Sequence, residues 1–122
     1  MIGNDYELVS GGSQATKGLA GTGDPAATAP IISRVFRQTG GGFELRRVPT
    51  MGWLRRALEG HSRADVAAGL QRAVEQLVGA YVARWVDRLG ERNLCLAGGL
   101  FANVRLNQAV VDAAGCEDLH VF

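Results

Sequence analysis

The amino-acid sequence predicts an α/β fold in which one long helix is followed by a parallel βαβ unit. Apolar residues recur at helical spacing over residues 62–89. Beyond them, two short apolar runs enclose a glycine pair and a second helical pattern. Eleven of the 17 glycines and all three prolines lie in residues 1–60, where we expect turns and short elements. We therefore divide the chain into an irregular region, residues 1–60, and a regular region, residues 61–122, which together form one incomplete domain.

The irregular region is expected to contain three short elements. Pro30 is placed to open a helix over residues 31–38, which the following glycines would end. Residues 43–48 alternate between apolar and polar side chains, a pattern typical of an edge strand. A further short helix is expected over residues 50–58.

The long helix has clear signals at both ends. Ser62 and Asp65 match a capping box, in which a hydroxyl and a carboxylate satisfy free amide groups of the first turn. Gly90 stands where a left-handed terminating residue belongs. Gly69 and Gly79 each cost about 1 kcal/mol of helix propensity relative to alanine. Close approach of another backbone would justify both glycines.

The apolar stripe of this helix needs partners along its whole length. At 1.5 Å per residue the helix is roughly 40 Å long, whereas a domain of this size has a diameter of roughly 35 Å. We therefore expect a piece of a larger protein, or a homo-oligomer formed through the exposed stripe. The stripe consists of Val66, Leu70, Ala73, Val74, Leu77, Val78, Tyr81, Val82, Trp85, Val86 and Leu89.

The rest of the regular region is expected to form the βαβ unit. An apolar run at residues 93–97 suits a buried strand, and a glycine pair breaks it. Residues 102–114 have helical periodicity, and Gly115 ends them. Residues 119–122 then form a second strand, which should be parallel to the first with a right-handed crossover.

The glycine pair, Gly98 and Gly99, is the best candidate for a binding site. Glycines let backbone amides approach a bound group, and the N-terminus of the next helix adds a partial positive charge, so phosphate is the usual ligand. Asn103 would add a side-chain amide, and Asn107 lies one turn on along the same face. Lys17, the sole lysine, lies in a glycine-rich loop from which it can reach a phosphate. Glycines also occur at such turns for steric reasons alone, which leaves a structural role open.

Composition excludes several classes of protein. The chain is 47% hydrophobic and 20% charged, as in soluble globular proteins, and no run of eighteen apolar residues predicts a membrane span. A net charge of +1 does not favour a nucleic-acid or membrane partner. Cys95 and Cys116 fit neither a disulfide framework nor a zinc site, and Cys95 is expected to be a small buried hydrophobe. We therefore expect a cytoplasmic protein.

Two segments resemble one enzyme family. Residues 94–108, LCLAGGLFANVRLNQ, closely resemble a segment of the nodulation-factor and antibiotic carbamoyltransferases, in which LAGG and a hydrophobic residue precede two asparagines four residues apart. Residues 17–25, KGLAGTGDP, are similar to that family's MGLAPYGDP, with Lys17 in place of the methionine and Thr22 in place of the aromatic residue. The long helix also occupies the expected place between them, so the resemblance extends from about residue 10 to residue 122.

This resemblance implies a fold, an activity and a site. The family has a large N-terminal domain with the ribonuclease-H-like fold of the actin and sugar-kinase superfamily. A smaller domain converts carbamoyl phosphate and ATP to carbamoyl adenylate. The large domain then transfers the carbamoyl group to a hydroxyl acceptor, with an iron-type metal ion near the nucleotide. By this likeness Gly98, Gly99 and Asn103 lie against the adenylate, and Asn107 is a further candidate.

Several parts of the family pattern are absent from the sequence. The metal site of the family uses an HxxxH motif, whereas this chain has only His61 and His120, far apart. The adenylate-forming domain is absent, so we expect an internal piece of the transferase domain that is inactive alone. Two alternatives stay open: a non-catalytic module in which the long helix pairs with a partner helix, and another ATPase of the same superfamily.

Overall fold

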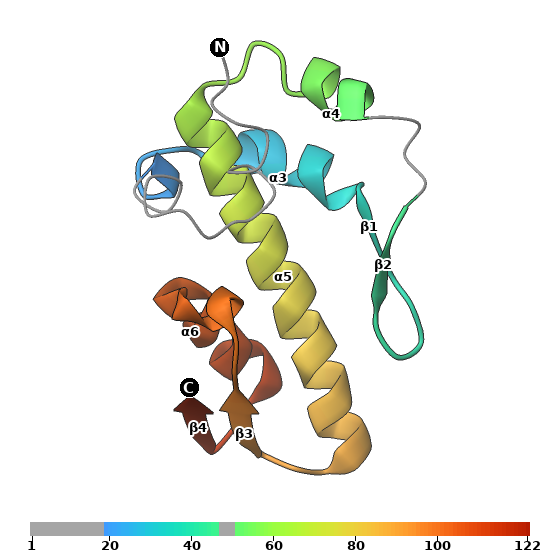
Figure 1. The fold of residues 1–122 in the computed structure, drawn as a ribbon, viewed down its shortest axis with the longest axis vertical. Helices are drawn as coiled ribbons and strands as arrows, with labels where there is room; N and C mark the ends of the chain where they lie inside the picture. The colour runs from blue at the N-terminus through green and yellow to red at the C-terminus, as the bar shows by residue number, and fades with distance from the viewer. Residues whose placement is uncertain (1–18, 47–50) are drawn as a thin grey trace.

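The computed structural model describes residues 19–46 and 51–122, which fold around one long helix. Helix α5 runs along the long axis; α3 and α4 lie at one end, and the βαβ unit at the other (Figure 1). The predicted mixed α/β class is confirmed, with one antiparallel and one parallel two-stranded sheet. The elements are α3 (Pro25–Ser33), β1 (Phe36–Gln38), β2 (Phe43–Leu45), α4 (Met51–Ala57), α5 (Arg63–Leu89), β3 (Asn93–Leu96), the 3-10 helix η1 (Gly99–Ala102), α6 (Val104–Ala114) and β4 (Asp118–Val121).

Helix α3 begins earlier than the sequence analysis predicted. The predicted helix over residues 31–38 is wrong, since α3 ends at Ser33 and β1 occupies the last three positions. The stronger start signal is Asp24 followed by Pro25: the Asp24 carboxylate accepts a hydrogen bond from the amide of Ala26 at 2.9 Å. Pro30 lies inside the helix.

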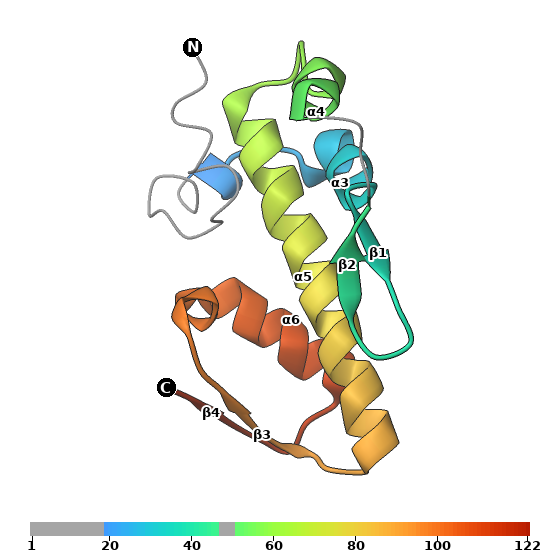
Figure 2. The same cartoon turned by 45° about the vertical axis from the view of Figure 1, so that its right-hand side comes forward.

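The hairpin and the short helix agree better with prediction. Strand β2 lies within the predicted edge strand and pairs antiparallel with β1; residues 47 and 48 lie outside the described residues. Helix α4 confirms the short helix predicted over residues 50–58. The hairpin lies on one side of α5, and α6 lies on the other (Figure 2).

Both ends of α5 confirm the predicted signals, with one correction. The Ser62 hydroxyl accepts from the amide of Asp65 at 3.0 Å, and Gly90 ends the helix with φ +68°. The Asp65 carboxylate, however, does not complete a reciprocal box, because it accepts from the backbone amide of Asp24 at 2.8 Å. This carboxylate therefore ties the start of α3 to the first turn of α5.

The two glycines inside α5 have the close neighbours that we expected. A Cβ on Gly69 would lie 2.7 Å from the backbone nitrogen of Ala29 in α3, and a Cβ on Gly79 would lie 3.4 Å from the backbone oxygen of Ala109 in α6. Helices α3 and α6 thus supply partners for the apolar stripe from within the chain. Leu89, at the end of the stripe, remains 68% exposed.

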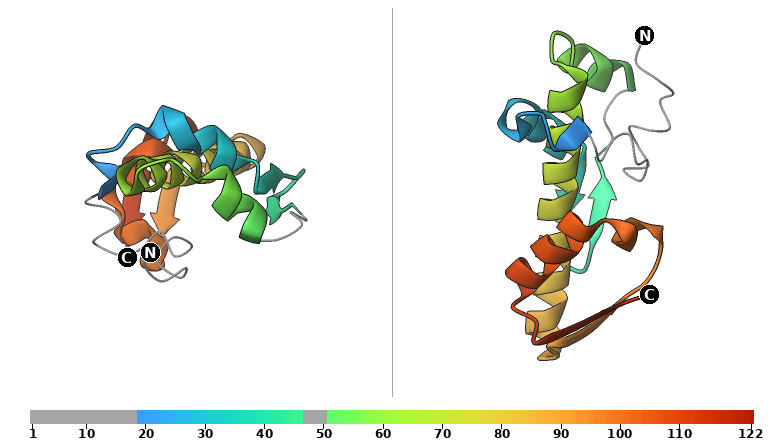
Figure 3. Two further views of the ribbon diagram at one scale, coloured as in Figure 1. Left: turned by 90° about the horizontal axis from the view of Figure 1, so that it is seen from above. Right: turned by 90° about the vertical axis from the view of Figure 1, so that its left-hand side faces the viewer.

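The second end of the molecule has its own small core. Leu106 and Val110 of α6 are fully buried against Val78 of α5 and Leu96 of β3. Strands β3 and β4 are parallel, as predicted, and run side by side at this end (Figure 3). The prediction of a buried strand with a buried Cys95 is wrong, because no described element covers the face of β3 on which Cys95 lies exposed. Within the described residues, no helix has the length and apolarity that a membrane span requires.

Candidate functional site

The glycine turn, residues 97–103, connects β3 to α6. Gly98 has φ +112° and ψ 163°, a conformation essentially restricted to glycine. Gly99 then starts η1, whose turns are closed by hydrogen bonds from Phe101 to the Gly98 carbonyl (3.1 Å) and from Asn103 to the Leu100 carbonyl (3.3 Å). Because of η1, helix α6 begins at Val104 and not at residue 102 as predicted.

The glycine turn exposes unused hydrogen-bond donors. Gly98, Gly99 and Leu100 are solvent exposed, and no hydrogen bond between described residues uses their backbone amides as donors. A Cβ at either glycine would meet no atom within 4 Å. Three consecutive amides of exposed residues therefore have no hydrogen-bond acceptor among the described residues.

Asn103 supports the turn from the inside. Its side chain caps α6, with Oδ1 accepting from the amide of Leu106 at 3.1 Å, and the residue is only 7% exposed. Its Nδ2 donates to Oε1 of Gln71 in α5 at 2.7 Å, and Gln71 Nε2 donates back to Oδ1 at 3.2 Å. The side-chain amide that we expected to face a ligand instead faces α5, because the helix cap and Gln71 engage both of its polar atoms.

The other two predicted site residues have different positions. Asn107 lies one turn into α6, and its Nδ2 donates to the Phe101 carbonyl of η1 at 2.8 Å. Its Oδ1 is buried and has no partner among the described residues. Lys17 lies outside the described residues. The structure thus places Gly98, Gly99 and Asn103 in the glycine turn and Asn107 beside it in α6, and of these four only the glycines have backbone amides without an acceptor among the described residues.

Sequence reasoning missed two polar residues of α5 that lie behind this turn. Gln71 is 8% exposed, and its Nε2 also donates to Oε1 of Glu75 at 2.7 Å. Glu75 forms an ion pair with Arg105 of α6, at 3.5 Å between Oε1 and Nε. The signal in the sequence is a glutamine four residues before a glutamate within an otherwise apolar or small helix face, the spacing at which two helical side chains meet.

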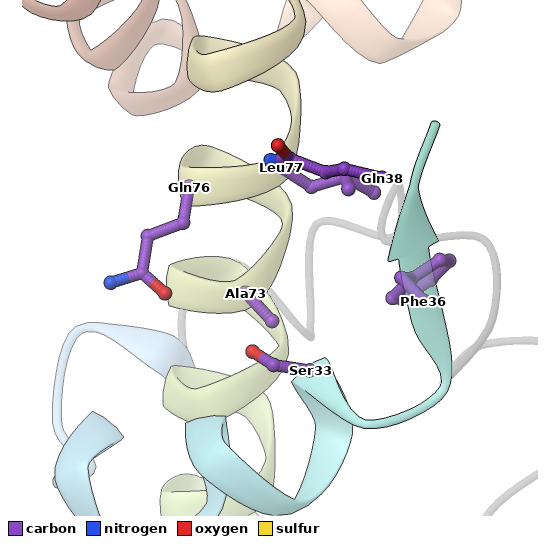
Figure 4. Close-up of a pocket in the computed structure, with 6 residues that line it drawn as sticks. All are labelled: Ser33, Phe36, Gln38, Ala73, Gln76 and Leu77. Carbon is purple, nitrogen blue, oxygen red and sulfur yellow. The ribbon is translucent and has the colours of Figure 1, made fainter. Parts of the chain in front are cut away.

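A separate pocket of about 220 Å³ lies between α3, β1 and α5 (Figure 4). Because Phe36 and Gln38 belong to strand β1, the pocket lies on the hairpin side of α5. Helix α6 lies on the other side of α5 (Figure 2). Its walls carry hydroxyl, amide and apolar groups and no ionisable side chain, so they offer no charge to an anionic ligand. The lining residues are Ser33, Phe36, Gln38, Ala73, Gln76 and Leu77.

The described residues do not fit the iron-type ion that the resemblance implies. Within residues 19–46 and 51–122, no three His, Cys, Asp or Glu side chains converge to hold a metal ion. His61 and His120 are both exposed, and His120 faces Asp118, at 3.5 Å between Nε2 and Oδ2.

A comparison with protein families agrees with the motif at the glycine turn. A family model described as "Carbamoyltransferase N-terminus" matches residues 41–122. The matched segment is about two thirds of the chain and includes α4, α5 and the complete βαβ unit.

Proposed function

The chain belongs to the carbamoyltransferase family, and we propose that it takes part in the transfer of a carbamoyl group from carbamoyl adenylate to a hydroxyl acceptor. The adenylate would be made from carbamoyl phosphate and ATP. The glycine turn would hold the phosphate group of the nucleotide. In this proposal the βαβ unit belongs to a domain of the ribonuclease-H-like superfamily, and the partners are small molecules.

The observation that carries the proposal is the set of open amides at Gly98, Gly99 and Leu100. Phosphate oxygens accept hydrogen bonds from backbone amides, and hydrogen bonds to a charged group contribute about 1.5–3 kcal/mol each, more than those between neutral groups. The N-terminus of α6, at Val104 after η1, adds the partial positive charge of a helix start. An anion is therefore the ligand that this turn favours.

Main-chain groups, and not the Asn103 side chain, make the proposed contact. Turning this side chain outward would break its bonds to Leu106 and Gln71. Leaving buried partners unsatisfied costs about 1–3 kcal/mol per group. The exposed amides need no such rearrangement, so they are the donors that we assign to the phosphate.

The amides would act on the leaving group of the reaction. The acceptor hydroxyl oxygen attacks the carbamoyl carbon, the bond from that carbon to the phosphate oxygen breaks, and AMP leaves with the bonding electron pair. A base takes the proton of the hydroxyl group. Negative charge grows on the phosphate oxygen as the bond breaks, and preorganised donors at that place lower the barrier.

Calorimetric titration of the full chain with ATP and with carbamoyl phosphate tests the proposal. We expect ATP to bind, and Gly99→Val to weaken this binding about tenfold, because a branched side chain blocks the approach to the amides. Gly40→Val is the matched control, since Gly40 is also exposed, lacks a positive φ and has open space around it. An ATP affinity that is absent in the unmodified chain, or equal in both variants, would contradict the proposal.

A further inference from the structure

We propose that Gln71, held by Glu75, is a positioning residue for the glycine turn. Its side chain fixes the orientation of the Asn103 amide and thereby the geometry of the open donors. The expected effect on ligand affinity rests on the proposed function, whereas the effect on the turn itself can be measured without a ligand.

The side-chain amides of Gln71 and Asn103 are buried, and each donates a hydrogen bond to the other. Gln71 and Asn103 are 8% and 7% exposed, although they are 32 residues apart in sequence and belong to different helices. Asn103 Nδ2 donates to Oε1 of Gln71 at 2.7 Å, and Gln71 Nε2 donates to Oδ1 of Asn103 at 3.2 Å. A buried amide without partners is costly, so each side chain holds the other in place.

The carboxylate of Glu75 and the backbone amide of Leu106 together determine which way the two side-chain amides point. An ionised carboxylate only accepts hydrogen bonds, so the NH2 group of Gln71 must face it, at 2.7 Å. The Oε1 atom of Gln71 then faces Asn103 and requires a donor there, namely Nδ2. Oδ1 of Asn103 then accepts from the amide of Leu106 and from Nε2 of Gln71.

The orientation of the Asn103 side chain affects the glycine turn, because Asn103 lies at the end of η1 and at the start of α6. Its backbone amide ends η1 by donating to the Leu100 carbonyl, and its side chain starts α6. A reversed amide would place an NH2 group against the amide of Leu106, where two donors repel. The cap would then be lost, and Asn103 would turn, which moves the peptide groups from Gly98 to Leu100.

The exposed surface of α6 supplies a matched control. Gln108 Nε2 donates to Oδ1 of Asp112 at 2.8 Å, which is the same glutamine-to-carboxylate bond at the same four-residue spacing. Both of these residues are exposed and make no contact with the turn through hydrogen bonds. Gln108→Leu therefore removes an equivalent bond without the positioning function.

The experiment compares the full chain with Gln71→Leu, Glu75→Gln and Gln108→Leu. Gln71→Leu keeps a similar side-chain volume. Glu75→Gln keeps the side-chain length but replaces the carboxylate, which only accepts hydrogen bonds, with an amide, which also donates. Amide ¹H–¹⁵N spectra of the unliganded proteins report on Gly98, Gly99 and Leu100, calorimetry gives the affinity for ATP, and thermal melting gives stability. If Gln71→Leu does not fold, Glu75→Gln decides the result, because this change lies in a partly exposed side chain.

We expect both α5 variants to shift the amide signals of the turn and to weaken ATP binding about tenfold at a temperature where they are folded. Gln108→Leu should change neither. If the α5 variants melt earlier but keep the turn signals and the ATP affinity, their role is structural only and the inference is overturned. If the unmodified chain does not bind ATP while the turn signals still move, the proposed function fails and the positioning function stands.

Discussion

Two glycine-rich turns among the described residues differ in how their peptide groups are hydrogen-bonded. In the hairpin loop, residues 39–42, consecutive backbone carbonyls accept hydrogen bonds from side chains of α5. In the glycine turn, residues 97–103, the consecutive backbone amides of Gly98, Gly99 and Leu100 donate to no described residue. The donors to the hairpin loop are Arg84 to Thr39, Arg88 to Gly40 at 3.0 Å and Trp85 to Gly41 at 3.1 Å.

The neighbouring helix explains this difference. The last turns of α5 carry guanidinium and indole groups, which only donate and therefore take up carbonyls. The Phe43 ring, packed edge to face against Tyr81, holds the same loop from its other strand. Near the glycine turn, the Gln71 side chain of α5 is hydrogen-bonded to the Asn103 side chain and not to the backbone amides of the turn. Glycine content alone does not identify a binding turn. The informative feature is whether the backbone N–H and C=O groups of the turn are already hydrogen-bonded within the chain.

The largest effect is expected at Gly98. Gly98→Ala forces a side chain onto φ +112°, which costs about 1–3 kcal/mol of stability. Gly40→Ala, in the hairpin loop, has a permitted φ and open space, so it should change stability by less than about 0.5 kcal/mol. Urea denaturation of both variants measures the difference; equal midpoints would show that the two turns have the same backbone requirement.

A smaller effect is expected when the hairpin loop loses one of its donors. Trp85→Phe removes the indole bond to Gly41 and should cost about 0.5–1.5 kcal/mol. Amide hydrogen exchange should become faster at residues 39–42 and stay unchanged at Gly98 and Gly99. Trp53→Phe is the control, because Trp53 stacks with Arg34 and not with this loop. Faster exchange at both turns would mean that they are coupled.

The smallest effect concerns Glu91, just before the strand that leads to the glycine turn. The backbone amide of Asn93 donates to the Glu91 carboxylate at 2.9 Å and lowers the pKa of that carboxyl below its usual value. A lowered pKa in the folded state stabilises the protein above the unfolded pKa, and this contribution is lost as the pH falls through the folded pKa. Below about pH 5, the melting temperature should therefore decrease less steeply with falling pH for Glu91→Gln than for the unmodified chain. Equal slopes would contradict this.

The sequence predicted the elements whose signals are local. Ser62 and Gly90 mark the ends of α5, and Gly115 marks the end of α6; each acts on backbone groups within a few residues. The error at α3 is also local, because the pair Asp24-Pro25 is a stronger helix start than Pro30.

The site was predicted only in part, because its support is not local. The place of Gly98 and Gly99 between β3 and α6 follows from the motif, and their role in binding stays a prediction. The inward turn of Asn103 depends on Gln71, which lies 32 residues away on another helix. No periodicity or spacing in a single sequence relates these two side chains. The exposure of Cys95 likewise depends on whether another element covers that face of β3.

Amide ¹H–¹⁵N spectra recorded during a titration with ATP test directly whether the glycine turn is an anion site. The signals of Gly98, Gly99 and Leu100 should move with increasing ATP and saturate, while those of residues 39–42 stay in place. Signals of the glycine turn that do not move, or that move no more than those of the hairpin loop, would contradict the account.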